Sequence, residues 1–290
     1  MVQTNGQSSS QAPQTSQVTK KYFEIIKYDG YLTVKFLEEI SRESSKALEE
    51  QLKELVSAKC HIIMIFNHVQ SVSKNALRVF LSLKQQLKAA EKKLRLILVP
   101  ESVKAFLRSE GVLEGLVISG DLRGALIDLG VLSAKSFDVN FVNPFLEAMI
   151  ETFKIQCHTE CKPGKIVLKK PYEEIGGDLS GVIGLTSETF KGSIVLSFPK
   201  DTFLKIASNM LGKIYTDITN EIRDVGAELT NIVLGRSKVV LNERGYAIKS
   251  ALPSVICGAD HRSTGLTLGS AVIVQFESDA GPFSVMISVS

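Results

Sequence analysis

The sequence predicts two folding units, an α/β unit over residues 21–137 and an α+β unit over residues 138–290, after a polar tail over residues 1–20. Strand and helix patterns alternate in the first unit, which is typical of a sheet covered by helices. The second unit combines long helical patterns with runs of strands. The formal charge also changes, from about +5 before residue 138 to about −2 after it, which favours two separate units.

Each element of the first unit has its own signal. The tail contains Gln, Ser, Thr, Pro and Gly and almost no large apolar residue, so we expect disorder there. Apolar and β-branched runs predict strands at 22–26, 31–36, 62–66 and 94–99. Amphipathic patterns predict helices at 44–56, 76–87, 101–107 and 121–127. Asp29-Gly30 marks the first turn, and Pro100 ends the fourth strand.

The second unit begins with a helix. Asn143 as a cap and Pro144 in the first turn predict a helix that runs to about residue 154. Asp201 predicts the cap of a further helix to residue 210, and a long helix follows from about 219 to 242. Strands are predicted at 165–169, 179–186 and 192–197, and around 246, 271 and 284.

The long helix carries the main functional signal. At about 100° per residue, Asp224, Glu228 and Asn231 fall within roughly 60° of one another, and Gly235 and Lys238 continue the same stripe. An apolar stripe about 120° away predicts the core-facing side: Ile222, Val225, Leu229, Ile232, Val233 and Val240. Asn inside a helix costs several tenths of a kcal/mol relative to Ala, so Asn231 indicates a function. A solvated helix face is the simpler interpretation of the spacing alone.

The run from Glu221 to Lys238 resembles the signature helix of the CheC/CheX/FliY family of chemotaxis phosphatases. In that family an acidic residue or Ser precedes Glu and Asn at this spacing, and a Pro follows, here Pro253. Other segments also resemble CheX: 142–150, 178–186, 191–198 and 209–212. The resemblance covers about residues 140 to 290 and implies a pseudo-symmetric fold with long helices packed on an antiparallel sheet. Glu147 is followed by Ile150 where a second site would have Asn, which implies one site per chain.

The first unit resembles a STAS domain, the module of anti-sigma-factor antagonists, over about residues 22 to 135. The order of its elements and the segments 69–77 and 96–112 carry this resemblance. STAS antagonists have Asp-Ser-Ser/Thr-Gly at the strand-to-helix switch, whereas this chain has Ser73-Lys74-Asn75-Ala76, so that Lys74 replaces the phosphoacceptor. Ser73 is most simply the N-cap of the next helix. A phosphosite moved by one residue to Ser73 is the alternative, because a phosphate is favourable at a helix N-terminus.

The two resemblances imply a phosphatase that hydrolyses the aspartyl-phosphate of a CheY-type response regulator, with the STAS half as a docking module. In this interpretation Glu228 and Asn231 are catalytic, while Asp224, Gly235 and Lys238 bind the partner. Asn231 holds water for in-line attack, because a carboxamide both donates and accepts hydrogen bonds. The chain itself needs no cofactor, since the receiver brings Mg²⁺ and a Lys. The alternative is a non-catalytic binding switch that regulates a signalling partner.

Composition limits the other classes of function. The charge asymmetry is too small to indicate nucleic acid or an anionic membrane as a partner. No run reaches the ~18 apolar residues of a membrane span, and the N-terminus has no signal-peptide pattern. Cys157-His158-Thr159-Glu160-Cys161 suggests a metal site only superficially, because no second ligand cluster exists, so we expect no metal. The four scattered cysteines favour reduced thiols in the cytoplasm. The partner of the STAS half is not identified by the sequence, and the CheX resemblance implies a dimer through sheet edges.

Overall fold

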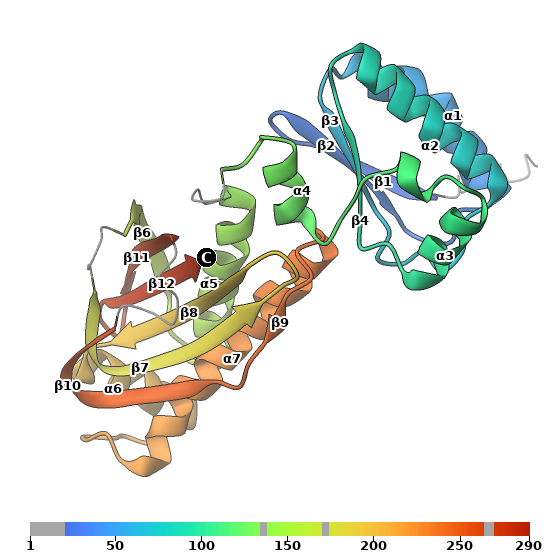
Figure 1. The fold of residues 1–290 in the computed structure, drawn as a ribbon. Helices are drawn as coiled ribbons and strands as arrows, with labels where there is room; N and C mark the ends of the chain where they lie inside the picture. The colour runs from blue at the N-terminus through green and yellow to red at the C-terminus, as the bar shows by residue number, and fades with distance from the viewer. Residues whose placement is uncertain (1–20, 134–137, 170–173, 264–269) are drawn as a thin grey trace, which may run out of the picture.

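The computed structural model describes residues 21–133, 138–169, 174–263 and 270–290. These residues form two lobes that lie end to end, and helix α7 of the C-terminal lobe reaches the junction between them (Figure 1). The tail over residues 1–20, for which the sequence predicts disorder, lies outside the described residues. Among the described residues, no helix has both the length and the apolar character needed to cross a bilayer.

The N-terminal lobe is built on a five-stranded sheet in the order β1-β2-β3-β4-β5. Its strands are β1 Phe23–Lys27, β2 Tyr31–Phe36, β3 His61–Ile65, β4 Leu94–Ile97 and β5 Ile118–Ser119. β1 and β2 form an antiparallel hairpin, and the remaining neighbours pair in parallel. Gly30 lies in the hairpin turn with φ 81°, a conformation that favours glycine.

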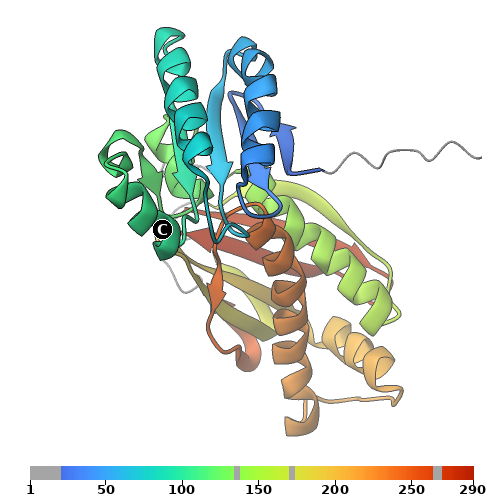
Figure 2. The same cartoon turned by 90° about the vertical axis from the view of Figure 1, so that its right-hand side faces the viewer.

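Helices cover one face of this sheet. They are α1 Arg42–Ser57, α2 Lys74–Ala89 and α3 Glu101–Ser109, followed by the short 3₁₀ helix Leu113–Gly115. The last helix of the lobe, α4 Leu122–Asp128, packs on the opposite face with Ile63 and Ile97. α1 and α2 stand side by side over the sheet (Figure 2). Their buried Leu48, Phe80 and Leu83 join Val34 and Met64 of the strands in one apolar core. The predicted order of elements is confirmed for this lobe, apart from the two-residue β5, which is too short to give a sequence pattern.

The C-terminal lobe contains a seven-stranded antiparallel sheet in the order β10-β7-β8-β12-β11-β6, with β9 paired to β7. Its strands are β6 Cys161–Leu168, β7 Ile175–Thr186, β8 Lys191–Phe198, β9 Lys249–Ser250, β10 Ser254–Ser263, β11 Ser270–Ser278 and β12 Phe283–Val289. Its helices are α5 Val139–Gln156, α6 Lys200–Leu211 and α7 Asn220–Glu243. α5 and α7 pack together against one face of the sheet (Figure 2).

Several predicted boundaries in this lobe are wrong. The strand expected around residue 246 begins only at Lys249, as the two-residue β9, because Gly245 and Ala247 have φ values of 96° and 52° that extended strands do not adopt. Asp201 is not a cap but lies in the first turn of α6, whose N-cap is Pro199. The long helix was predicted almost to the residue, since its apolar period is strong.

The start of α5 is a further correction. Asp138 caps the helix, so Pro144 lies inside it instead of in its first turn. Proline inside a helix leaves the carbonyl four residues earlier without its amide partner. Here that carbonyl belongs to Asn140, and Arg244 Nη1 donates a hydrogen bond to it at 2.9 Å. A side chain from the end of α7 therefore compensates for the proline, which local sequence patterns do not reveal.

The two lobes share a hydrophobic core. One cluster joins Tyr31, Ile63 and Ile97 of the N-terminal sheet to Phe141 of α5 and to Tyr246. These N-terminal side chains come from the sheet face opposite α1 and α2, as the alternation along a strand requires. The lobes are thus packed together as one body and are not connected by a linker alone.

A buried carboxylate adds a polar contact at the same junction. Asp121 is fully buried and accepts a hydrogen bond from Gly124 N at 2.8 Å, which caps α4. It also accepts from Thr189 Oγ1 at 2.7 Å and from Ser187 Oγ, both in the β7–β8 turn of the other lobe. Asp121 therefore fixes the N-terminal lobe to the C-terminal sheet.

Candidate functional site

A close contact between glycines sets the position of helix α7 on the sheet. A Cβ on Gly181 of β7 would lie 3.1 Å from the carbonyl carbon of Gly226 in α7, and nearer still to its oxygen. Thr230 Oγ1 donates to that same oxygen at 2.7 Å. Backbones approach this closely only where the side chain is absent. Consequently the residues that follow Gly226 on the outward face of α7 are held at a defined height above the sheet.

That outward face presents the predicted site residues to solvent. Asp224, Glu228, Asn231 and Gly235 are all exposed, while Lys238 is half-buried. Glu228 and Asn231 lie one helical turn apart, so both side chains point in the same general direction. Neither forms a hydrogen bond or an ion pair with any other residue that the structure describes. The structure thus places the predicted residues on one free surface, where their polar groups are available to a partner.

The opposite side of α7 follows the predicted apolar stripe with one correction. Ile222, Val225, Leu229 and Val233 are buried, and Ile232 is half-buried. Val240, however, is 37% exposed. The reason is that the last turns of α7 extend beyond the C-terminal sheet and meet the N-terminal lobe instead (Figure 1).

A cleft of about 530 Å³ flanks Glu228 on the side of the α6–α7 connection. Its walls include Met210, Leu211, Lys213 and Tyr215, with Asp224 and Glu228 along one rim. Tyr215 Oη donates to Glu221 at 2.8 Å, and this hydrogen bond raises the pKa of the tyrosine hydroxyl. Sequence reasoning missed this cleft. No local pattern predicts it, because its walls come from two helices and the connection between them.

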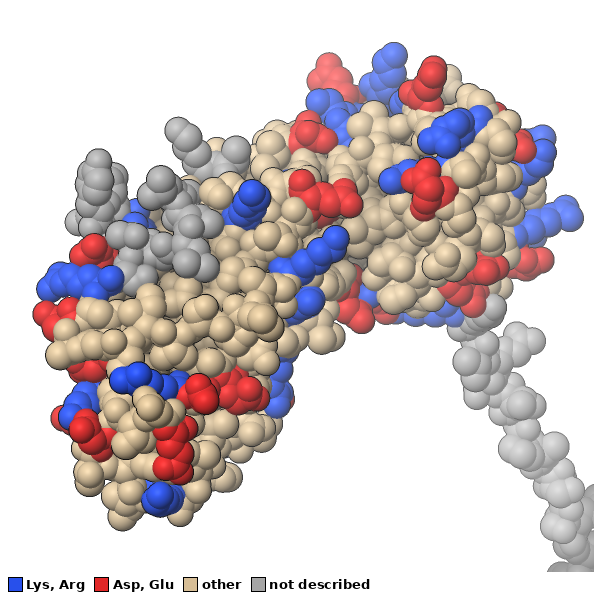
Figure 3. Space-filling view, turned by 60° about the horizontal axis from the view of Figure 1, so that its bottom comes forward, with Lys and Arg blue, Asp and Glu red and all other residues tan. Residues whose placement is uncertain are grey.

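On the face that Figure 3 shows, the charged side chains of the C-terminal lobe do not gather into one large patch. In the space-filling view, acidic and basic residues alternate between broad uncharged areas, and the outline narrows where the lobes meet (Figure 3). This surface suits a protein partner better than a polyanion, whose binding requires clustered positive charge.

The described residues contain no group of three or more His, Cys, Asp or Glu side chains arranged for a metal ion. Burial raises the pKa of both the Cys157 and the Cys161 thiol to about 12, which leaves them protonated at neutral pH. These thiols are therefore poor metal ligands and poor nucleophiles as they stand.

One Ser–His pair was not anticipated. His261 Nε2 lies 2.7 Å from Ser180 Oγ, and Ser180 Oγ donates to Ser197 Oγ at 2.7 Å. A nucleophile must reach its substrate, but Ser180 and Ser197, which face each other on the neighbouring strands β7 and β8, are fully buried. The pair is part of the sheet packing, and the exposed face of α7 remains the better candidate site.

Ser73 occupies the position that its simplest interpretation predicts. It is the N-cap of α2, and its Oγ accepts from Ala76 N at 3.4 Å. The same hydroxyl donates to Ser41 O at 3.2 Å and lies 2.9 Å from Ser45 Oγ. The neighbouring Lys74 forms an ion pair with Glu110 at 2.8 Å. The Ser73 hydroxyl is therefore used in joining the starts of α1 and α2.

The arrangement on α7 has a defined chemical capacity. A carboxylate can pair with a cation of a partner, and a carboxamide one turn away can orient a water molecule. Neither group is a typical covalent nucleophile, and neither has a general base beside it. The site therefore suits a reaction in which the partner carries the reactive centre.

Comparisons with known proteins identify relatives of both lobes. Residues 179–277 match the family model described as chemotaxis phosphatase CheX, and residues 22–125 match the STAS domain. A protein of Thermotoga maritima named CheY-P phosphatase CheX is 30% identical over 155 residues, which cover 52% of this chain and 97% of the relative.

Solved structures agree with this result. A CheC-like superfamily protein from Shewanella sp. PV-4 is 35% identical, with a TM-score of 0.50, and the match covers 53% of this chain and 99% of that one. The chemotaxis protein CheX from Vibrio vulnificus is 34% identical, also with a TM-score of 0.50, over 52% of this chain and 100% of that one. All three relatives thus correspond to about half of this chain.

Proposed function

The chain belongs to the CheX family of chemotaxis phosphatases, and from this premise we propose that its C-terminal lobe hydrolyses the aspartyl-phosphate of a CheY-type receiver domain. One observation carries the proposal. Glu228 and Asn231 stand one turn apart on an exposed helix face, and neither has a partner among the described residues. The T. maritima relative is named for the same activity.

Asn231 is the group that acts on the reaction itself. The amide accepts a hydrogen bond from a water molecule through its oxygen and donates one through its nitrogen, so it can hold that water in line with the scissile P–O bond. Phosphoryl transfer depends mostly on positioning and on electrostatic stabilisation, so one aligned water is a sufficient contribution. The water adds to phosphorus, the aspartyl oxygen leaves, and inorganic phosphate is released.

Glu228 is proposed as the docking residue. Its carboxylate is exposed, and pairing with the Lys beside the receiver's phosphoryl group would fix the register of Asn231. Asp224 and Lys238 lie further along the same stripe and would contact the partner. Nothing lies within 4 Å of a Cβ placed on Gly235, so the glycine leaves room for the partner's backbone.

The metal in this reaction belongs to the substrate. We assign Mg²⁺ to the receiver, where it supplies positive charge around the phosphoryl oxygens, and no cofactor to this chain. The same substrate implies that the protein works in the cytoplasm.

The division of the chain at residues 137 and 138 also belongs to this proposal, with a STAS-type binding module before it. Since the Ser73 hydroxyl caps α2, we propose that this module works without a phosphorylation cycle at Ser73. A dimer through sheet edges is supported by edge strand β6, whose Ile166, Val167 and Leu168 are exposed.

The test is turnover of phosphorylated receivers by the purified full-length chain. Wild-type protein should accelerate phosphate release from at least one CheY-type receiver in a panel. Glu228→Ala should weaken engagement by about 2–5 kcal/mol, the usual effect of truncating one member of a desolvated charge pair, and saturating protein should recover part of the rate. Binding of a receiver without accelerated release would instead support the non-catalytic switch.

A further inference from the structure

A second cleft, which we call the junction cleft, lies between the N-terminal sheet and the end of α7. It has a volume of about 280 Å³. Ile26, Thr33 and Lys35 line it from the N-terminal lobe, and Val239, Val240 and Glu243 line it from α7. Because its two walls come from different lobes, this cleft exists only where a STAS-type lobe is packed on a CheX-type helix.

The alternation of β1 explains the first wall. Phe23 is buried under the helices, and Ile25 lies on that side with it, whereas Ile26 faces the junction cleft opposite Thr33. Ile26 of the edge strand β1 remains 44% exposed, whereas Thr33 and Lys35 of β2 are buried beside the end of α7. The wall is therefore open and partly apolar along β1.

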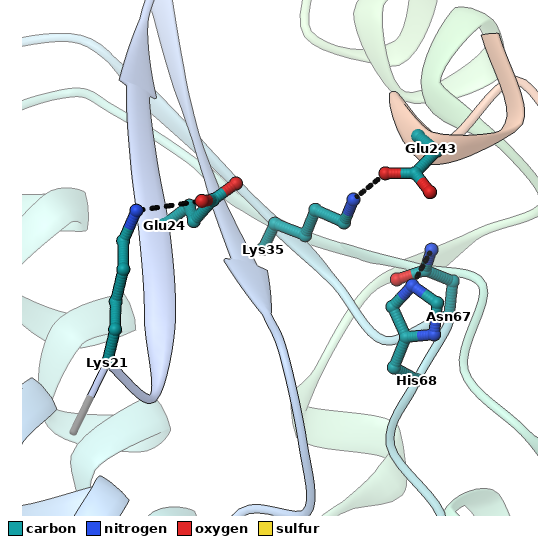
Figure 4. A network of polar contacts seen from close by, with 6 residues as sticks. All are labelled: Lys21, Glu24, Lys35, Asn67, His68 and Glu243. Atoms are coloured by element: carbon teal, nitrogen blue, oxygen red, sulfur yellow. Dashed lines mark hydrogen bonds and ion pairs between the residues drawn. The ribbon is translucent and has the colours of Figure 1, made fainter. Parts of the chain in front are cut away.

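An ion pair holds the two walls together. Lys35 Nζ lies 2.6 Å from Glu243 Oε2, and Figure 4 shows the two side chains reaching toward each other across the cleft. The Lys35 side chain is only 11% exposed. A buried ammonium is costly without a partner, so the pair fixes the spacing of the walls. Lys21 and Glu24 form a second pair at 2.7 Å beside it (Figure 4).

The second wall is continuous with the candidate site. Val239 is 64% exposed and lies eleven residues after Glu228, which places it within about 20° of Glu228 around the helix. It is eight residues after Asn231, or about 12 Å along the axis. An interface of ordinary size buries about 800 Å² on each partner, which corresponds to a disc with a radius of roughly 16 Å. A receiver seated over Asn231 therefore covers Val239 and reaches the N-terminal wall.

We propose that the junction cleft is a second docking surface for the same receiver, which places an apolar side chain between Ile26 and Val239. This inference rests on the proposed function and extends it to the N-terminal lobe. The relative from T. maritima is matched over 97% of its length by about half of this chain, so it has no counterpart of the N-terminal wall. The STAS-type lobe thus contributes directly to the choice of receiver.

The experiment compares two neighbouring isoleucines of β1. Ile26→Asp places a charge in the junction cleft, while Ile25→Asp changes a residue of similar exposure, 39%, on the opposite face of the same strand. A second pair is Val239→Asp with Val139→Asp as its control, since both valines are 64% exposed on helices. Thermal unfolding of all four variants verifies that each remains folded.

The measurements are the KM and kcat for a phosphorylated receiver that the wild-type chain turns over, and the Kd for that receiver loaded with beryllium fluoride. Ile26→Asp and Val239→Asp should raise KM and Kd about tenfold or more, as for the loss of an apolar anchor, with kcat unchanged. Ile25→Asp and Val139→Asp should match the wild type.

Three results would overturn the inference, and they are distinguishable. Equal KM values for Ile26→Asp and Ile25→Asp, with wild-type turnover intact, would remove the second surface but leave the proposed function. If the wild type turned over no receiver, the proposed function would fail and the inference with it. If Val239→Asp converted a wild-type dimer to a monomer in sedimentation, the cleft would belong to self-association.

Discussion

Gly181→Ala tests whether the contact between β7 and α7 sets the position of the site. The added methyl group would lie 3.1 Å from the carbonyl carbon of Gly226 and closer to its oxygen and to the Thr230 hydroxyl. None of these atoms lies at the far end of a flexible side chain. To restore ordinary contact distances, α7 must withdraw from the sheet by roughly 1 Å.

Two effects of different size follow from that displacement. Overpacking of this kind costs about 1–3 kcal/mol, which lowers the Tm by roughly 2–12 °C in a protein of this size. Misplacement of a catalytic group by about 1 Å costs on the order of a hundredfold in rate. At 25 °C the variant remains folded, so the loss of stability alone would hardly change the rate. We therefore expect the large fall in the dephosphorylation rate to come from the displaced site.

Gly235→Ala is the control for stability on the same helix. Nothing lies within 4 Å of its added methyl group. Replacing an exposed helical glycine by alanine stabilises a helix by about 1 kcal/mol, so the Tm should rise. Thermal unfolding is measured for both variants, and turnover of a phosphorylated receiver is compared between Gly181→Ala and the wild type. The reasoning is refuted if Gly181→Ala matches the wild type in both the Tm and kcat.

Three further outcomes follow from the contacts described. Ser73→Ala should lower the free energy of unfolding in urea by about 1 kcal/mol, because the α2 cap is lost. Phosphosite mapping of protein from growing cells should find Ser73 unmodified, and substantial phosphate on Ser73 would contradict its role as a cap alone. Asp121→Ala should cost about 3–5 kcal/mol, because it leaves the α4 N-terminus and the Thr189 hydroxyl unpaired and removes one of the two hydrogen bonds of the Ser187 hydroxyl, and unfolding should separate into two steps; a single unchanged transition would show that Asp121 does not couple the lobes. Cys157 and Cys161, whose pKa values are raised to about 12, should resist iodoacetamide at pH 8 until the protein is unfolded, and rapid alkylation of the native protein would show that they are accessible thiolates.

The sequence was most informative where one period extends over many residues. Helix α7 was predicted almost to the residue, and its apolar and polar faces separate as expected near Glu228 and Asn231. When an amphipathic helix packs on a single sheet, its buried apolar residues recur at the helical period, so the packing can be recognised in the sequence. The candidate site lies on such a helix, so its residues could be identified before the fold was known.

Features created by packing between the lobes could not be predicted in this way. Val240 has the period of a core residue but lines the junction cleft, because a second lobe replaces the sheet there. Pro144 was placed at a helix start because nothing local shows that Arg244 compensates for it. The half-buried ion pair of Lys35 joins it to Glu243, which lies more than 200 residues away in the sequence. Such long-range pairs leave no periodic signal.

The central claim is that Asn231 positions the water that attacks the receiver's phosphoryl group. Asn231 is exposed and has no partner among the described residues, so Asn231→Ala should not destabilise the protein, and alanine raises helix propensity. The decisive measurement is kcat of Asn231→Ala and of the wild type on the same phosphorylated receiver, at saturating concentration. The account predicts a loss on the order of a hundredfold, as for removal of one oriented hydrogen-bonding group, with Kd little changed. Undiminished turnover by the folded variant would contradict it.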